Sequence, residues 1–178
     1  MKSNPTDLDA VIVGAGAAGL YMLHRLRGMG LRARVLEAGG GVGGTWYWNR
    51  YPGARCDVPS LEYSFGFSDE LQEEWEWTET MPAQPEVLRY LEHVAQRFDL
   101  YRDIQFGTRV SAAHFDTAAK RWAVKTEADE CFSARFCIPA KLSSGLILGS
   151  LGLSAMAPMP FARYSFPRSA IRASQRFT

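Results

Sequence analysis

Three glycines and one acid near the start of the chain have the types and spacing of a dinucleotide site. Gly14, Gly16 and Gly19 form a GxGxxG pattern between a short apolar run and a stretch of helical periodicity. The first glycine permits a tight turn, the second lets the backbone approach a pyrophosphate, and the third lets helix and strand pack closely. The helix N-terminus adds free N–H groups and the positive end of its dipole. Glu37, 18 residues after Gly19, can accept hydrogen bonds from a ribose 2′-hydroxyl.

The charge of Glu37 and the residues that follow it narrow the choice of nucleotide. A carboxylate would repel a 2′-phosphate, so the sequence favours FAD or NAD over NADP at this site. A second glycine cluster, "GGGVGG", follows the acid at the point where an ordinary NAD dehydrogenase continues into a crossover helix. Backbone with little side chain at the pyrophosphate edge suits the larger dinucleotide. We therefore expect FAD.

The segment Thr45–Asp57, "TWYWNRYPGARCD", is too aromatic for an ordinary surface loop and too polar for a core segment. It places Trp46, Tyr47 and Trp48 together, then a Pro-Gly turn, then Arg-Cys-Asp. We interpret it as a loop that wraps a ligand. For each ring taken singly, packing in the core is an equally good explanation.

The elements that must position these residues are read from the periodicity of apolar side chains. The sequence predicts strands at residues 10–13 and 32–38 and helices at residues 18–29 and 85–100. Residues 57–85 form an aromatic and acidic excursion, in which Trp75 and Trp77 are expected to anchor the chain to the domain surface. Three runs with period-2 character, residues 104–116, 121–128 and 131–138, predict a β-meander. The expected fold is α/β: a Rossmann-like FAD-binding domain, a parallel sheet with helices, interrupted by a β-meander and incomplete at the C-terminus.

Composition excludes some classes of function. The chain has 178 residues and a formal net charge of +1 without a basic stripe, which argues against a nucleic-acid binder. Its three cysteines have no metal-ligand spacing, and an odd number of them suits a reducing cytoplasm. His93 and His114 are interpreted as surface residues. The charge is uneven: residues 1–140 carry a net −4, whereas residues 141–178 hold five basic residues and no acid.

Four segments together resemble one family. "GAGAAGLY", "VLEAGGGVGGTWYWNRYPGARCDVPSLEYSFGFS", "EWEWTE" and "QPEVLRYLEHVAQRFDL" are similar to the N-terminal FAD domain of Baeyer–Villiger monooxygenases, over residues 8 to about 138. The resemblance implies that NADPH reduces FAD, that O₂ adds to the flavin, and that the resulting peroxyflavin converts a ketone substrate to an ester or lactone. A related N- or S-oxidising flavin monooxygenase is the alternative.

The resemblance also implies roles for particular residues. Asp57 resembles the acid that orients a catalytic arginine, for which this chain offers no candidate. The nicotinamide (NADP) side would be lined by Arg55, Cys56 and Asp57. The residues that resemble FAD contacts are Gly14, Gly16, Ala17, Ala18, Gly19, Glu37, Gly43, Gly44, Thr45, Trp46, Asp57, Val58, Tyr63 and Val110.

The likeness ends after residue 138, near the break in charge, and Pro139 and Pro158 are expected to fit a continuing strand poorly. We therefore expect two parts: a partial FAD-binding domain at residues 1–140, and a tail at residues 141–178 that is frame-shifted or disordered. A membrane anchor at residues 142–162 is a weaker alternative because of its Ser, Gly and Pro content, and no membrane association is expected. A natural short flavoprotein is weaker still. Without a second GxGxxG the chain alone should not oxidise ketones, and a non-catalytic FAD-binding remnant is the other reading of this polypeptide.

Overall fold

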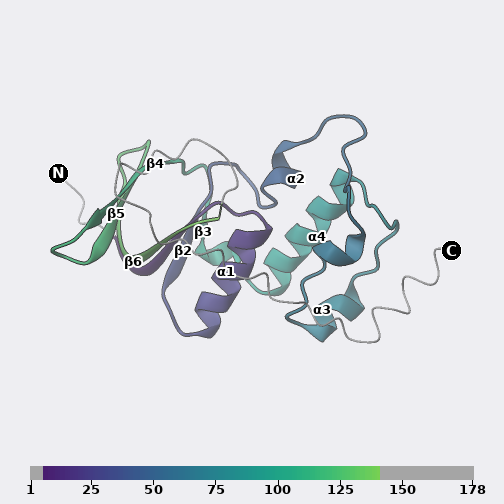
Figure 1. The fold of residues 1–178 in the computed structure, drawn as a ribbon, viewed down its shortest axis with the longest axis horizontal. Helices are drawn as coiled ribbons and strands as arrows, with labels where there is room; N and C mark the ends of the chain where they lie inside the picture. The colour runs from purple at the N-terminus through teal and green to yellow at the C-terminus, as the bar shows by residue number, and fades with distance from the viewer. Residues whose placement is uncertain (1–5, 141–178) are drawn as a thin grey trace.

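The computed structural model describes residues 6–140, which form one mixed sheet with helices packed beside it (Figure 1). The six strands lie in the order β3-β2-β1-β6-β5-β4. Their bounds are β1 Thr6–Val13, β2 Ala33–Leu36, β3 Ile104–Gln105, β4 Val110–Asp116, β5 Arg121–Thr126 and β6 Cys131–Pro139. The helices are α1 Ala17–Gly28, α2 Thr45–Trp48, α3 Asp69–Glu74 and α4 Gln84–Arg97, with 3₁₀ turns η1 at Ser60–Tyr63 and η2 at Tyr101–Asp103.

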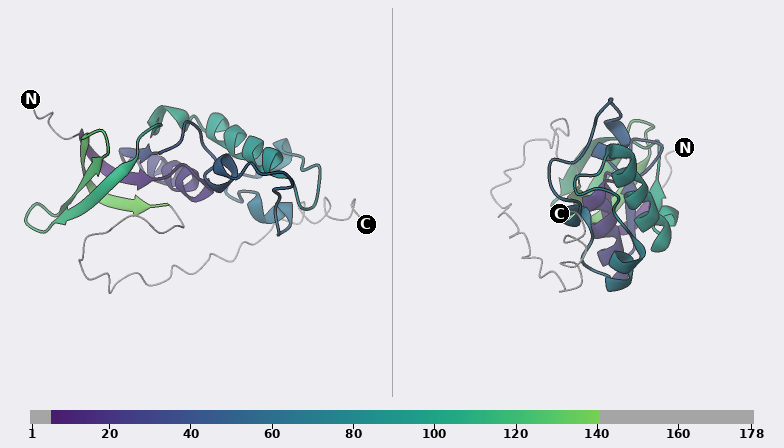
Figure 2. Two further views of the ribbon diagram at one scale, coloured as in Figure 1. Left: turned by 90° about the horizontal axis from the view of Figure 1, so that it is seen from above. Right: turned by 90° about the vertical axis from the view of Figure 1, so that its right-hand side faces the viewer.

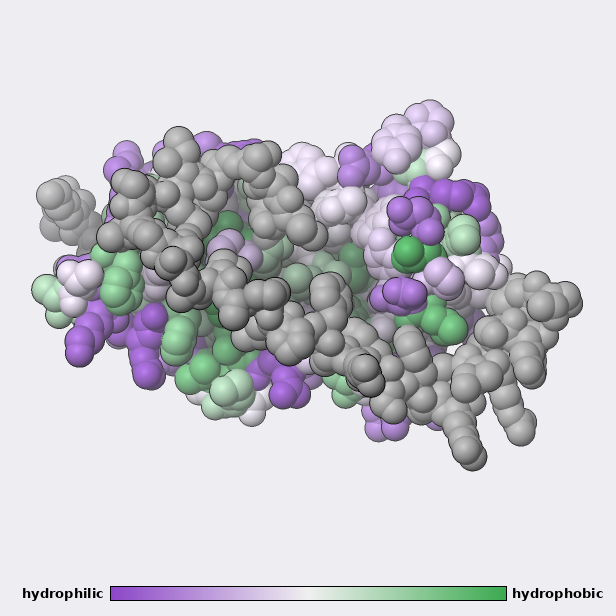
Figure 3. Space-filling view, viewed as in Figure 1, coloured by the Kyte–Doolittle hydropathy of each residue, from purple (hydrophilic) through white to green (hydrophobic). Residues whose placement is uncertain are grey.

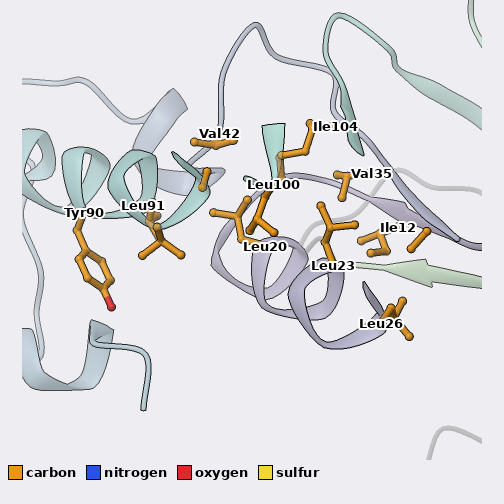
Figure 4. Close-up of a cluster of buried hydrophobic side chains, with 14 of the residues drawn as sticks. Ile12, Leu20, Leu23, Leu26, Val35, Val42, Tyr90, Leu91, Leu100 and Ile104 are labelled. Carbon is orange, nitrogen blue, oxygen red and sulfur yellow. The ribbon is translucent and has the colours of Figure 1, made fainter. Parts of the chain in front are cut away.

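The parallel half of the sheet consists of β3, β2, β1 and β6. The strand, glycine turn and helix predicted at the N-terminus are β1 and α1, and the second predicted strand is β2. The helix α1 packs on one face of these strands, where Leu20 and Leu23 meet Ile12 and Val35 in a buried cluster (Figure 4). Leu91 of α4 extends the same cluster, so two helices far apart in the sequence share one core. Apolar runs without alternation suit strands that are covered on both faces.

The antiparallel half is the predicted β-meander, β4-β5-β6, which lies at the end of the molecule away from α3 (Figures 1 and 2). Its side chains cover the second face of the parallel strands: Val110 and Val124 share a buried cluster with Val11 and Leu36. The first predicted run is divided in two. Ile104–Gln105 pair with β2 as β3, and the chain turns at Gly107, with φ +61°, before β4 begins.

The last strand, β6, belongs to both halves. It pairs antiparallel with β5 through residues 131–134 and parallel with β1 through Pro139. The third strand of the meander is thus itself the central strand next to β1. The expectation that Pro139 fits this strand poorly was wrong. Pro139 lies beyond the residues of β6 that pair with β5, so no partner strand on that side needs its missing N–H. The pairing with β1 continues past it, because the Ala140 N–H donates to the Val13 carbonyl at 2.9 Å.

The excursion between the two halves is anchored by aromatic packing, as expected. The Trp75 and Trp77 rings lie 5.3 and 4.9 Å from the ring of Tyr90 on α4. The Tyr90 hydroxyl accepts a hydrogen bond from the Phe65 N–H at 2.7 Å, and burial raises the pKa of Tyr90 to about 12. Figure 3 shows hydrophilic residues interleaved with hydrophobic ones over this α3–α4 end of the surface.

Within residues 6–140, no helix combines the length and the apolar character that a membrane crossing requires. The expectations for residues 141–178, the frame-shifted or disordered tail and the alternative membrane anchor, lie outside the described residues.

Candidate functional site

The first glycine loop joins β1 to α1. Gly14 has φ +103°, a backbone conformation that residues with a Cβ rarely adopt, and Gly16 is the N-cap of the helix. A Cβ on Gly19 would run into the Gly14 carbonyl, so only glycine permits this helix to lie so close to the loop. The first turn of α1 is Ala17, Ala18 and Gly19 and carries no acid. Its N–H groups and dipole end are therefore available to an anion.

Glu37 lies directly after β2 and is buried, with 5% of its surface exposed. Its carboxylate accepts two backbone hydrogen bonds, from the Ala15 N–H at 2.6 Å and from the Gly39 N–H at 2.7 Å. The acid thus ties the first glycine loop to the start of the second. Two accepted bonds still leave a second lone pair on each oxygen, because a carboxylate offers about four acceptor positions. Glu37 can hold both loops and still accept from a hydroxyl.

The second glycine cluster lies against the first, backbone to backbone. The Gly43 N–H donates to the Ala15 carbonyl at 2.9 Å. A Cβ on Gly44 would approach the Gly16 Cα to 2.8 Å, a distance that real side chains do not adopt. The two segments, predicted from the sequence to share one edge, lie together in the structure at the end of β1. We call Gly14–Gly19, Glu37 and Gly43–Gly44 the glycine cradle.

The aromatic loop, Thr45–Asp57, begins as the short helix α2 and then arches away from the body of the molecule (Figure 1). Trp46 is half-buried, and its ring meets that of Tyr63 edge-on, with centroids 5.5 Å apart. Tyr47 is half-buried: its hydroxyl accepts from the Gly40 N–H at 3.2 Å, and the Arg50 guanidinium lies 4.8 Å from its ring. Trp48 is exposed. The Trp48 ring still meets that of Tyr47 edge-on, with centroids 5.0 Å apart, so Tyr47 and Trp48 pack together while Trp46 packs separately on Tyr63. The three rings therefore do not form one wall.

The far end of the aromatic loop alternates between buried and exposed side chains. Arg55 is exposed and donates to Glu79 Oε2 at 3.0 Å, so it is engaged in a surface ion pair. Cys56 is buried, and burial raises the pKa of its thiol, an effect that a hydrogen bond with Tyr63 partly opposes. Burial likewise raises the pKa of Tyr63. The carboxylate of Asp57 faces outward, so a partner for it would have to come from beyond this loop.

Two further residues predicted to contact FAD, Val110 and Val58, lie outside the glycine cradle. Val110 begins β4 and follows Thr108, whose N–H donates to the Glu37 carbonyl at 2.8 Å, so the chain passes the acid immediately before it reaches Val110. Val58 is half-buried between Asp57 and η1. The glycine cradle is thus compact, whereas the other predicted contacts spread outward from it along the aromatic loop and β4.

The sequence analysis missed the residues of α4 that join these parts. Leu88 packs beneath Gly43, where an added Cβ would meet the Leu88 Cδ1 atom at 2.5 Å. Gln84, at the first position of α4, is buried; its side-chain Nε2 donates to the Trp46 carbonyl and its backbone N–H to the Ala54 carbonyl. A polar residue directly before the proline of a helix start was the only available signal, and it says nothing about distant partners.

Comparison with known proteins gives a consistent family. The profile of the NAD(P)-binding Rossmann-like domain matches residues 12–74. The phenazine N-monooxygenase of Lysobacter antibioticus is 44% identical over 141 residues, which cover 79% of this chain and 26% of that protein. The methyl acetate-forming acetone monooxygenase of Gordonia sp. (strain TY-5) is 45% identical over 133 residues, 75% of this chain and 25% of that protein.

Solved structures agree. Oxidised steroid monooxygenase bound to NADP superimposes with a TM-score of 0.75 at 58% identity, covering 76% of this chain and 26% of that one. Cyclohexanone monooxygenase from Rhodococcus sp. Phi1 bound to NADP⁺ gives a TM-score of 0.75 at 43% identity, covering 77% and 26%. The chain spans about a quarter of the length of the relatives it matches. The expected α/β Rossmann-like fold and the expected resemblance are therefore confirmed: the chain is similar to the N-terminal part of Baeyer–Villiger and related flavin monooxygenases.

Proposed function

We propose that residues 6–140 are the FAD-binding segment of an NADPH- and O₂-dependent flavin monooxygenase that acts on ketones. The observation that carries the proposal is the contact between the two glycine segments, in which Gly44 approaches Gly16 too closely for any side chain. A single glycine loop serves many nucleotide folds. A second glycine segment laid on the first, and tied to it through Glu37, extends the bare backbone beyond a single loop, as a larger dinucleotide requires.

The residues present fit FAD. The N–H groups of the first turn of α1 would hold the pyrophosphate, and Glu37 would accept from the ribose hydroxyls. Thr45, Trp46, Val58, Tyr63 and Val110 are the proposed outer contacts. FAD, when bound, supplies a ring that accepts hydride from a reduced nicotinamide and activates O₂. The contribution of this chain is to bind and orient that ring and, through the half-buried Trp46 and Tyr63, to keep water from one side of it.

We assign the Arg55–Asp57 end of the loop to the nicotinamide side. Asp57 follows the buried Cys56 and is itself exposed, so the backbone beside it is anchored while its carboxylate faces outward. There it would orient an arginine supplied from outside the described residues. A cation held in this way stabilises negative charge that develops at a reacting oxygen.

The test is a titration of the purified 178-residue chain with FAD, FMN and NADP⁺, followed by flavin fluorescence and calorimetry. We expect FAD to bind. FMN should bind more weakly because it lacks the adenosine half, and NADP⁺ should bind weakly because Glu37 faces its 2′-phosphate. Tighter binding of NADP⁺ than of FAD would overturn the proposal.

A matched pair of variants separates recognition from stability. Glu37 and Glu86 are both buried carboxylates with 5% exposure, and each accepts two hydrogen bonds, Glu86 from Thr78. Glu37→Gln and Glu86→Gln should lower the unfolding midpoint similarly. Only Glu37→Gln should weaken FAD binding, and equal losses of FAD affinity would contradict the assigned role of Glu37.

A second substrate class has support of its own. The relative from Lysobacter antibioticus is a phenazine N-monooxygenase, at an identity close to that of the acetone monooxygenase. N-oxidation is therefore the alternative to ketone oxidation. In a longer protein that contains this segment, a lactone formed from a cyclic ketone supports the first and an N-oxide formed from a phenazine supports the second.

We expect the isolated chain to turn over neither substrate, because its sequence has no second GxGxxG and, within residues 6–140, no arginine pairs with Asp57. This prediction keeps open the reading of the polypeptide as a non-catalytic FAD binder. Ester formation from a ketone, NADPH and O₂ by the purified chain would contradict it.

A further inference from the structure

We propose that Gln84 is a positioning residue that fixes the base of the aromatic loop beside the glycine cradle. The proposal rests on the FAD-binding role proposed above and adds a determinant of that role on α4, 38 residues beyond Trp46 in the sequence. Gln84 does not touch the reacting atoms. It acts through the backbone of the loop.

Gln84 bonds the loop at two points. Its side-chain Nε2 donates to the carbonyl of Trp46, near the start of the loop, and its backbone N–H donates to the carbonyl of Ala54, near the end, at 2.8 Å. Between these points the loop arches outward and carries exposed residues, Trp48 at 58% and Tyr51 at 64%. Gln84 therefore ties both ends of an otherwise exposed loop, and the Cys56 N–H, which donates to the Pro82 carbonyl at 3.0 Å, adds to the attachment of the far end.

The helix that carries Gln84 is itself fixed to the cradle. Leu88, one turn further along α4, packs beneath Gly43, and Tyr90 and Leu91 are 1% exposed in the core cluster. Residues four apart lie on the same helix face. The loop and the cradle are thus aligned by one rigid face, on which Gln84 holds the first and Leu88 the second.

The chemistry of the side chain is specific. An ionised carboxylate cannot donate to the Trp46 carbonyl, so the isosteric change Gln84→Glu, measured at pH 8, replaces the hydrogen bond by repulsion between two oxygens. A carboxylate in the first turn of a helix is favourable to the helix dipole. The change should therefore release the loop while α4 stays folded.

The control is Gln72→Glu. Gln72 on α3 makes the same kind of bond, from its Nε2 to the Phe65 carbonyl at 3.3 Å, away from the cradle. The same atoms are altered in both variants, and only the place differs.

The first measurement is made without ligand. Hydrogen exchange of the backbone amides in residues 46–57 should be faster in Gln84→Glu than in the natural chain and unchanged in Gln72→Glu. Unchanged exchange of these amides in Gln84→Glu would overturn the proposal. This readout does not depend on FAD, so it distinguishes failure of the positioning role from failure of the proposed function.

The second measurement compares FAD with ADP, which can occupy only the cradle. Gln84→Glu should weaken FAD binding about tenfold, the effect of about one hydrogen bond, and leave ADP affinity unchanged. An equal loss for both ligands would mean that Gln84 merely supports the fold and would refute the positioning role, as would the absence of any loss. If the natural chain binds ADP but not FAD, the FAD proposal fails while the hydrogen-exchange result still decides the role of Gln84.

Discussion

The backbone contact between Gly44 and Gly16 makes a prediction that can be measured without any ligand. Gly44 has φ +54° and ψ −115°, a conformation that L-residues adopt only under strain of about 1–3 kcal/mol. In Gly44→Ala the new Cβ would also lie 2.8 Å from the Gly16 Cα. Because the atom it meets belongs to the backbone, it cannot rotate out of the way as a flexible side chain can, and overpacking of this kind costs about 1–3 kcal/mol. Together the two effects predict a loss of about 4 kcal/mol.

Two other glycines separate these effects. Gly107 has φ +61° with open space around its Cβ position, so Gly107→Ala carries only the backbone strain, about 1–2 kcal/mol. Gly28 ends α1 in open space with an ordinary φ, so Gly28→Ala should be neutral or stabilise the chain by up to about 1 kcal/mol. The expected order of stability is therefore Gly28→Ala, then Gly107→Ala, then Gly44→Ala.

The assay is urea denaturation of the three variants and the natural chain, followed by tryptophan fluorescence. A two-state fit gives the free energy of unfolding and the slope, which should stay constant across the series. The reasoning is refuted if Gly44→Ala loses no more stability than Gly107→Ala, because the second glycine segment would then not lie on the first. If Gly44→Ala is too unstable to purify while Gly107→Ala folds normally, the packing argument stands.

Three further predictions concern the rest of the fold. The His24 ring is stacked on that of Phe67 with centroids 4.4 Å apart, and burial, with smaller contributions from Arg25 and Arg27, lowers the pKa of His24 from 6.5. Its contribution to stability is therefore complete above pH 6.5 and is lost as the pH falls through the lowered pKa. The resulting dependence of the unfolding midpoint on pH should be abolished in His24→Phe and kept in His114→Gln, at an exposed site. Arg121 donates from one side chain to the Leu8 and Ser133 carbonyls and the Ser133 hydroxyl, so Arg121→Lys should lower the free energy of unfolding by about 1–3 kcal/mol in the same urea assay, and an unchanged value would contradict this link between β1, β5 and β6. Cys131 is exposed, whereas burial raises the pKa of both Cys56 and Cys137, so a thiol reagent at pH 8 should label Cys131 first in the folded chain, and equal rates by mass spectrometry would show that the other two are not protected.

The glycine cradle was accessible from the sequence because each of its signals is local. The spacing of Gly14, Gly16 and Gly19 alone predicts a strand, a turn and a helix. The acid after the next strand lies at the same edge of the sheet, because the strands of a βαβ unit are parallel. The second glycine cluster could be assigned to that edge for the same reason. The sequence could not predict that Glu37 accepts hydrogen bonds from Ala15 and Gly39, because the donors are backbone N–H groups, which every residue except proline has.

The errors arose where pairing depends on distant residues. Periodicity identified the run that became β6 as a strand but could not tell that half of it pairs with β5 and all of it lies beside β1. Pro139 misled because a proline argues against the interior of a strand, and only the register Val13↔Pro139 shows that it lies at the end. Gln84 was missed because its partners are 30 and 38 residues away.

The contribution of α4 is to join segments that lie far from it in the sequence. The cradle is built from residues before 45 and the aromatic loop follows directly. The Trp46 and Tyr47 N–H groups donate to the Gly43 and Gly44 carbonyls, and α4 adds a second attachment. Leu88 beneath Gly43 and Gln84 beside Trp46 place one helix against both. A dinucleotide that spans cradle and loop gains from this arrangement, because the ordering of the loop is already complete before the ligand arrives. Loosening of either contact should then reduce FAD affinity more than ADP affinity, since only the longer ligand depends on the angle that α4 fixes.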